Sequence, residues 1–334
     1  MNKIELDEKV LFKLNNEELN LNKNNNINCN FSNGFFKQNN NITYNQNDVD
    51  GKILLNEIII SIIFILAFKF GTRNNDIYLY LLIFMAFRIF CHLKKDPIHL
   101  VYMFGYIISM NIQTPPYLDR KKYFPEHKFL EDPKNFAKIQ EEVRNVLKIK
   151  NDLPLTKNTY GKQNYYIGGG DQQKDNEDGW RLLMLKSGSD ITEKGQKICP
   201  FLCSLIKKIK NIKSCAVSII PKKKAIPIHV GYYKGFIRYQ LAVIIPEDRE
   251  NVFICVNGEK YSWKEGEGVI FDDTYPHKVY NNTDEDRVIL YIDVERSHMS
   301  NWLTYMNKTL LKLLENSSYV KDEIKRTEYQ VKLD

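Results

Sequence analysis

Seven short runs of β-branched and aromatic residues follow one another closely, and this series limits the possible folds most strongly. The runs are Cys215–Ile220, Gly235–Ile245, Val252–Val256, Lys260–Trp263, Gly268–Phe271, His277–Tyr280 and Arg287–Val294. Residues of these types favour strands. Between two of the runs, Asn257 and Gly258 favour a type I′ hairpin turn because both tolerate positive φ. Many short strands with close turns predict a mainly β fold, a double-stranded β-helix of the jelly-roll or cupin-like kind with flanking helices.

An amphipathic helix is predicted before this β region. Between Asp132 and Asn151 the apolar positions recur at spacings of mostly three and four, at Phe136, Ile139, Val143, Val146 and Leu147. That period places them on one helical face, so the helix should pack on the β core. We therefore expect a linker and packing helix over residues 96–160, a β-domain over residues 161–310 and a charged C-terminal tail over residues 311–334.

The N-terminal third differs in composition from the rest of the chain. Residues 1–50 are rich in Asn and Lys without a regular apolar pattern, which predicts a disordered segment. Residues 51–95 hold two apolar runs, Ile58–Phe68 and Ile77–Phe87, of eleven residues each. Because a membrane span needs about twenty residues, each run must recruit its flanks to cross a bilayer. We expect a membrane anchor of one or two helices, either a hairpin or an interfacial segment, and a buried helix pair is the alternative.

The side of the membrane on which the β-domain lies is open from the sequence. Arg88, Lys94 and Lys95 follow the second apolar run and favour a cytosolic β-domain by the positive-inside rule. Sequons favour the lumen of an intracellular membrane such as the ER, although such matches arise by chance in an Asn-rich chain. They lie at Asn30, Asn41, Asn281, Asn307 and Asn316.

Charge and cysteine content give no sign of a nucleic-acid partner or of a cysteine-based metal or redox site. The net charge of +7 comes from 48 basic and 41 acidic residues, whose runs are too short to predict a nucleic-acid partner. The six cysteines include no CxxC pair and no metal-site spacing with histidine. Cys199 and Cys203 are predicted to be buried core or helix residues.

His229 and His277 are the candidate metal ligands. His229 ends a segment fixed by Pro221 and Pro227, and His277 begins a predicted strand, so both imidazoles could meet at the mouth of a barrel. Neutral imidazole is a good ligand for Fe(II) and leaves other positions open for a cosubstrate and oxygen. Two unrelated structural histidines are the alternative.

Arg287 follows His277 by ten residues and begins the last predicted strand. A period of two places Arg287, Ile289, Tyr291 and Asp293 on one face of that strand. The planar guanidinium binds a carboxylate bidentately. A cosubstrate with two carboxylates, such as 2-oxoglutarate, would place one at the metal and the other at this arginine.

The motifs around these residues resemble the aspartyl/asparaginyl β-hydroxylase family, and most closely its bacterial lipid A 2-hydroxylase branch. The resemblance covers about residues 96–310 and includes a preceding apolar membrane segment. The matching stretches are Gln113–Asp119, Phe124–Glu126, Ser218–Gly231, Ile237–Leu241, Val256–Trp263, Glu265–Gly268, Phe271–His277 and Asp286–Arg296.

The resemblance implies a role for each matching residue. His229 and His277 would ligate Fe(II), and Arg287 would pair with 2-oxoglutarate. Ser218 matches a position that helps to hold the cosubstrate, and Arg238 matches a position in the cosubstrate or substrate pocket.

Two positions depart from common patterns. Gly231 stands where most 2-oxoglutarate oxygenases have a ligating Asp or Glu, a lack that the family shares. Gln240 stands where the family usually has a second cosubstrate-binding histidine. An amide carries no charge, so Gln240 predicts weaker cosubstrate binding or loss of activity.

The resemblance therefore implies a membrane-anchored dioxygenase that uses Fe(II), 2-oxoglutarate and O2 to hydroxylate an unactivated C–H bond. Its substrate would be an acyl chain of a membrane lipid or an Asp or Asn of a secretory peptide. A binding module without turnover is the alternative. Asp272 and Asp273 are candidates for orienting His277, or they form only a polar loop, and Lys222–Lys224 face either a lipid phosphate or solvent.

Overall fold

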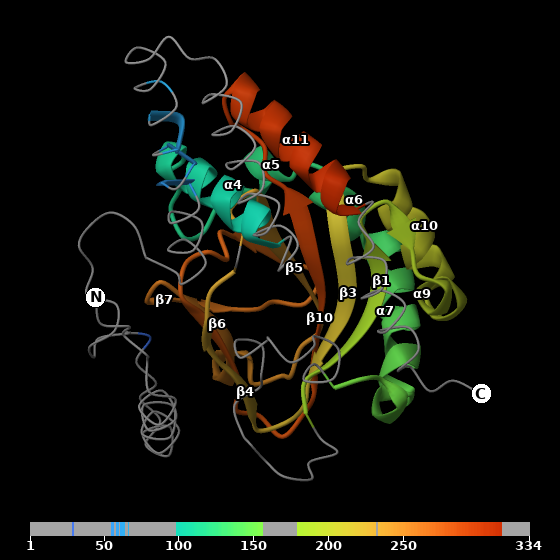
Figure 1. Ribbon diagram of the computed structural model, residues 1–334. Coiled ribbons are helices and arrows are strands. Elements are labelled where there is room, and N and C mark those ends of the chain that lie inside the picture. The colour runs from blue at the N-terminus through green and yellow to red at the C-terminus, as the bar shows by residue number, and fades with distance from the viewer. Residues whose placement is uncertain are drawn as a thin grey trace.

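Two antiparallel sheets form the centre of the molecule (Figure 1). The computed structural model describes Cys29, scattered positions between 55 and 66, and residues 98–155, 179–231 and 233–315. The six-stranded sheet has the order β2-β1-β3-β10-β5-β8, and the four-stranded sheet has the order β4-β9-β6-β7. The strands are β1 (Arg181–Ser187), β2 (Asp190–Ile191), β3 (Ile212–Ile220), β4 (Lys224–His229), β5 (Phe236–Ile244), β6 (Val252–Val256), β7 (Glu259–Ser262), β8 (Gly268–Phe271), β9 (His277–Asn281) and β10 (Arg287–Glu295).

Helices flank the six-stranded sheet and one end of the molecule (Figure 1). Helices α7 and α10 cover the outer face of this sheet, and α4 contacts α11. The helices are α4 (Ile98–Asn111), α5 (Arg120–Tyr123), α6 (His127–Glu131), α7 (Pro133–Lys148), α9 (Glu193–Ile198), α10 (Pro200–Lys208) and α11 (Asn301–Glu315), with short 3-10 turns η2 (Lys150–Asp152) and η3 (Arg249–Asn251).

Apart from the hairpin of β6 and β7, the strands from β3 to β10 alternate between the two sheets as the chain advances. Strands β3, β5, β8 and β10 belong to the larger sheet, and β4, β6, β7 and β9 to the smaller one. Asn257 and Gly258 have φ of 50° and 89° in the two-residue turn between β6 and β7, as the hairpin prediction requires. The prediction of a mainly β fold with the jelly-roll arrangement is confirmed for the described residues.

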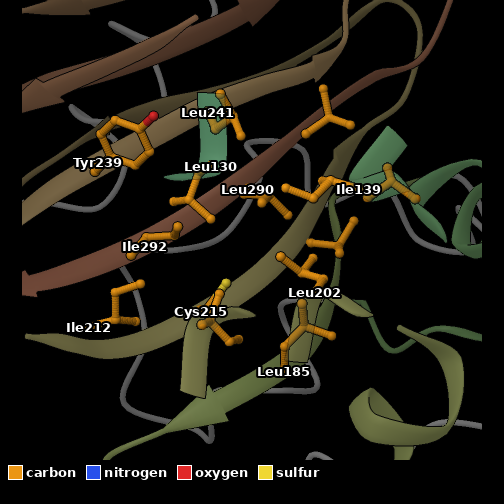
Figure 2. Packing of buried hydrophobic residues seen from close by; sticks show 14 of the residues in the cluster. Leu130, Ile139, Leu185, Leu202, Ile212, Cys215, Tyr239, Leu241, Leu290 and Ile292 are labelled. Carbon is orange, nitrogen blue, oxygen red and sulfur yellow. The ribbon is translucent and has the colours of Figure 1, made fainter. Parts of the chain in front are cut away.

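The alternation of side chains along each strand divides the interior into two cores. On β10, Val288, Leu290 and Ile292 point toward the helices, whereas Arg287 and Ile289 point between the sheets. Figure 2 shows the helix-side core, in which side chains from the large sheet gather with side chains from α6, α7 and α10. The labelled members are Leu130, Ile139, Leu185, Leu202, Ile212, Cys215, Tyr239, Leu241, Leu290 and Ile292. The other face of the large sheet, which faces the small sheet, is therefore available for the functional site.

Helix α7 confirms the predicted packing helix. Asp132 caps its start by accepting hydrogen bonds from the backbone N–H groups of Lys134 and Asn135, and Pro133 supplies the fixed φ that suits a first helical turn. Ile139 and Val143 on its inner face are fully buried. The helix ends at Lys148, three residues before the predicted end.

Several elements do not appear in the sequence prediction. Strand β1 is rich in Leu and has buried side chains on both faces, so it lacks the alternation that marks a half-buried strand. Helix α11 extends to Glu315 and so crosses the boundary expected between the β-domain and the tail. Asn281 and Asn307, which occur in sequons, are fully buried and hydrogen-bonded to backbone carbonyls, so their amides have a structural role.

Most of residues 1–97 lies outside the described residues, and the predicted anchor with it. The described positions between 55 and 66 are helical. In the part of the chain that the structure describes, no helix is long and apolar enough to cross a membrane. Cys29 departs from the expectation of a disordered segment because it is buried and forms a disulfide with Cys255.

Candidate active site

A β-bulge turns His229 into the space between the sheets. Strand β4 pairs Ile226 with Val279 and then His229 with His277, so three steps along β4 match two along β9. Ile226 faces the inter-sheet core, and without the extra residue His229 would point to the opposite face. Pro227 lies inside this irregularity of the edge strand β4, and edge strands and bulges are where sheets tolerate proline.

The imidazole rings of His229 on β4 and His277 on β9 lie in contact, because the two residues pair directly across the strands. Their ring centroids lie 4.1 Å apart. Nδ1 of His277 lies 2.9 Å from the carbonyl oxygen of Tyr275, which can only accept, so Nδ1 carries the proton and Nε2 keeps its lone pair. Burial, and next the neighbouring His229, hold the pKa of His277 well below its usual value. His277 is therefore a neutral imidazole, as a metal ligand must be.

The position two residues after His229 has no room for a side chain. A Cβ added at Gly231 would collide with the carboxylate of Asp273. The backbone N–H of Gly231 also donates to the carbonyl oxygen of Asp273 at 2.6 Å, which holds the two segments together. Asp273 thus fills the space that a ligating Asp or Glu at residue 231 would need.

Arg287 is a buried cation without an anionic partner in the described part of the chain. Its side chain is 1% exposed, and its Nε and Nη1 atoms have no hydrogen-bond partner there. The guanidinium carbon lies 4.2 Å from the ring centroid of Trp263. Burial lowers the pKa of Arg287 to about 9. A buried guanidinium with idle donors is a site that an anionic ligand would complete.

Ser218 and Gln240 line the same pocket as Arg287 and the two histidines. The hydroxyl oxygen of Ser218 accepts a hydrogen bond of 2.9 Å from the indole N–H of Trp180. Gln240 is 5% exposed, and its Oε1 has no hydrogen-bond partner among the described residues. Sequence reasoning missed Trp180, because a single Trp before a Leu-rich strand carries no signal of a pocket.

Arg238 also lines the pocket, but two carboxylates already engage its guanidinium. Its Nε donates to Asp293 at 2.7 Å, and its Nη2 donates to Asp273 at 2.7 Å. The guanidinium lies 3.9 Å above the ring of Tyr291. Arg238 is therefore better placed to fix the wall of the pocket than to bind a free carboxylate.

Asp272 belongs to a separate buried ion network. Its Oδ2 accepts from Arg296 at 2.7 Å and from Thr114 at 2.9 Å, and Lys234 lies 3.4 Å away. Burial raises the pKa of Asp272, but these cations outweigh it and hold that pKa well below its usual value. From the sequence, Asp272 and Asp273 are candidates for orienting His277. Neither accepts a hydrogen bond from Nδ1 of His277, because the carbonyl oxygen of Tyr275 does so instead.

The loop lysines lie away from this pocket. Lys222 and Lys223 are exposed, and Lys223 binds Asp284 and the carbonyl oxygen of Asn282. The solvent-facing alternative is therefore the better description of these two side chains.

The residues fit a divalent metal and a dicarboxylate. Two inward histidines, one with its tautomer fixed, suit a metal such as Fe(II), and the idle donors of Arg287 suit a carboxylate. In the described ranges, no three or more His, Cys, Asp or Glu side chains are grouped so that they could hold a metal ion, in keeping with glycine at residue 231. The predicted residues His229, His277, Arg287, Ser218, Arg238 and Gln240 all line one pocket.

Comparison with known proteins matches this chain to hydroxylases. The family model for aspartyl/asparaginyl beta-hydroxylase matches residues 133–297, which confirms the predicted resemblance. The ornithine lipid ester-linked acyl 2-hydroxylase of Rhizobium tropici is 27% identical over 57% of this chain and 64% of its own length. The aspartyl/asparaginyl beta-hydroxylase of Mus musculus is 28% identical over 34% of this chain and 16% of its own length. This chain thus spans less than two thirds of either relative.

Among solved structures, a prolyl-4-hydroxylase of Pseudomonas putida matches with a TM-score of 0.31 and 12% identity, over 48% of this chain and 88% of that one.

Proposed function

Because residues 133–297 match the family model for aspartyl/asparaginyl beta-hydroxylase, we propose that the chain is an Fe(II)- and 2-oxoglutarate-dependent hydroxylase acting on a lipid acyl chain at a membrane. One observation carries the proposal: a single pocket holds two inward-facing histidines and a buried arginine with unused hydrogen-bond donors. The metal and the two ends of 2-oxoglutarate would complete these groups.

Each pocket residue has a part in this proposal. When bound, Fe(II) with 2-oxoglutarate and O2 supplies the oxidant that inserts one oxygen atom into a C–H bond, with succinate and CO2 as coproducts. His229 and His277 would hold the metal, and Arg287 would bind the far carboxylate of 2-oxoglutarate with help from the Ser218 hydroxyl. Arg238 would keep the pocket wall in place through its two carboxylate partners.

An exposed face of α11 supports a lipid substrate over a peptide. On α11, Trp302 and Tyr305 are 54% and 75% exposed, and Lys312 lies about two turns further along the same stripe of the helix. Aromatic and basic side chains on one exposed helical face suit the headgroup region of a bilayer. Helix α11 contacts α4, which directly follows the apolar region of residues 51–95.

The two sequence relatives also differ in how much of this chain they match. The lipid hydroxylase matches 57% of it, and the peptide hydroxylase matches 34%. The longer match to the lipid hydroxylase supports a lipid as the substrate.

The test is mass spectrometry of products from the purified full chain. The protein would be incubated with Fe(II), 2-oxoglutarate and either membrane lipid vesicles or Asp- and Asn-containing peptides. We expect a gain of one oxygen on an acyl chain, with none in the His277→Ala variant. Oxygen on a peptide Asp or Asn instead would contradict the lipid assignment and keep the reaction type.

Gln240 supports a second candidate, a binding module without turnover. Its buried Oε1 has no partner among the described residues, whereas a histidine usually stands at this position in the family. Such a module would bind metal and 2-oxoglutarate yet release no succinate. Succinate release with Fe(II) and O2 separates the two functions.

A further inference from the structure

A disulfide joins the N-terminal segment to the β-domain across the apolar region. Cys29 and Cys255 are bonded although 226 residues separate them in sequence. Cys29 precedes the apolar residues 51–95, and Cys255 lies after them in β6. The cross-link therefore brings the two flanks of the apolar region to one place.

The side chains around the disulfide are buried on the outer face of the small sheet. On β6, Val252, Ile254 and Val256 face the inter-sheet core, so Phe253 and Cys255 point to the opposite, outer face. Phe253 and Cys255 are nevertheless 1% and 0% exposed.

Cys29 belongs to the cluster that buries this outer face. It is 8% exposed and packs with Phe253, Cys255 and Tyr280. The chain at Cys29 thus covers apolar side chains of the small sheet, which would align the two sulfur atoms before they bond.

The pairing is selective among the cysteines that the structure describes. Cys199, Cys203 and Cys215 are buried as free thiols in the helix-side core. Burial raises the pKa of each of these thiols, which keeps them protonated and unreactive. The oxidised pair is the one that links the N-terminal segment to the sheet.

Forming this bond requires an oxidant. Two thiols lose two protons and two electrons as the S–S bond forms, and a protein disulfide donor takes up the electrons by becoming a dithiol. Such donors and lasting structural disulfides belong to oxidising compartments such as the ER lumen, whereas thiols stay reduced in the cytosol.

We propose that the β-domain faces an oxidising lumen and that residues 51–95 enter and leave the membrane on that same side. A covalent bond cannot cross a bilayer, so Cys29 and Cys255 must share one face of it. The chain between Cys29 and Cys255 then crosses any membrane an even number of times, zero included. This topology rests on the membrane attachment in the proposed function, and it places the substrate in the lumenal leaflet.

Peptide mapping of the full chain, isolated from its natural cells, tests the bond. The cells would be quenched in acid and alkylated before digestion with trypsin, without a reducing agent. The linked product would join residues 24–37, which contain Cys29, to residues 250–260, which contain Cys255, and each of these peptides has one cysteine. Residues 214–222, which contain Cys215, provide the control and should appear alkylated only.

We expect most of the Cys29 peptide in the linked form, and none of it linked in a Cys255→Ser variant. Recovery of Cys29 and Cys255 mainly as separate alkylated peptides would overturn the proposal. Succinate release by the same preparation reports the proposed function independently, so an active protein with free thiols would refute only the compartment.

Protease protection tests the shared side. Epitopes at the N-terminus and the C-terminus should both survive protease in intact vesicles and both be digested after detergent is added. Digestion of either epitope in intact vesicles would overturn the lumenal topology. A non-reducing gel should show the linked chain as a monomer, and a linked dimer would overturn the intramolecular pairing.

Discussion

Replacing Arg287 with methionine should stabilise the ligand-free protein and remove its affinity for 2-oxoglutarate. The side chain is 1% exposed and stacks on Trp263, so the flexible methionine can fill nearly the same volume. What the substitution removes is a buried charge whose Nε and Nη1 have no hydrogen-bond partner in the described chain. Function and stability therefore oppose each other at this residue.

The magnitude follows from the loss of solvation at the guanidinium. Burial lowers the pKa of Arg287 from 12.5 to about 9, which corresponds to roughly 5 kcal/mol against the charged form. Loss of the contact with Trp263 costs about 1–2 kcal/mol, and relaxation around a buried charge reduces the gain further. We expect a net stabilisation of about 1–3 kcal/mol, seen as a rise in Tm of roughly 2–10 °C.

Thermal unfolding without oxygen, with Mn(II) in place of iron, measures both effects. In the wild type, 2-oxoglutarate at a hundred times its Kd should add about 2.7 kcal/mol, and in Arg287→Met it should add nothing. Arg296→Met is the matched control, because Arg296 is as deeply buried but is paired with Asp272. That control should lose about 3–5 kcal/mol. A less stable Arg287→Met protein that still responds to 2-oxoglutarate would refute the assignment of this carboxylate site.

Three further predictions concern other parts of the molecule. Gln240→His should lower the KM for 2-oxoglutarate about tenfold, since a charge-assisted hydrogen bond is worth about 1.5 kcal/mol more than a neutral one; an unchanged KM in succinate assays would contradict this. Trp302→Ala with Tyr305→Ala should weaken sedimentation with anionic vesicles about tenfold or more, because two exposed interfacial aromatics are lost; undiminished binding would exclude α11 from the membrane surface. Below about pH 4 the wild type should lose the stability that ionised Asp272 contributes, because the folded-state pKa of this carboxylate lies below the unfolded value. Urea unfolding should show a weaker acid dependence in Asp272→Asn, and equal slopes would be evidence against the ion network.

The sequence predicted β3, the strands from β5 to β10 and the candidate residues because all of these depend on local patterns. The runs that form β6 and β8 have the predicted bounds, since strand propensity and turn residues mark both ends. Arg287 faces the pocket because the alternation along β10 is uninterrupted up to Ile292. The motif around His277 placed its ring at a strand start, where the structure has it.

What the sequence could not predict depends on contacts between distant segments. The inward turn of His229 comes from a bulge that is defined only by the pairing with β9. The neutralisation of Arg238 needs Asp293 and Asp273 from two other parts of the fold. Such pairings, like the bond of Cys29 to Cys255, follow from tertiary packing and leave no mark on either segment alone.

In the proposed function, this pocket couples oxidation of 2-oxoglutarate to a metal held by His229 and His277. The most direct measurement of this coupling is succinate release by the purified chain with Fe(II), 2-oxoglutarate and O2, together with iron content per chain. We expect one bound iron and iron-dependent succinate release, both lost in His229→Ala and His277→Ala variants that remain folded by circular dichroism. A wild-type protein that binds no iron, or histidine variants that release succinate at the wild-type rate, would contradict the proposed function.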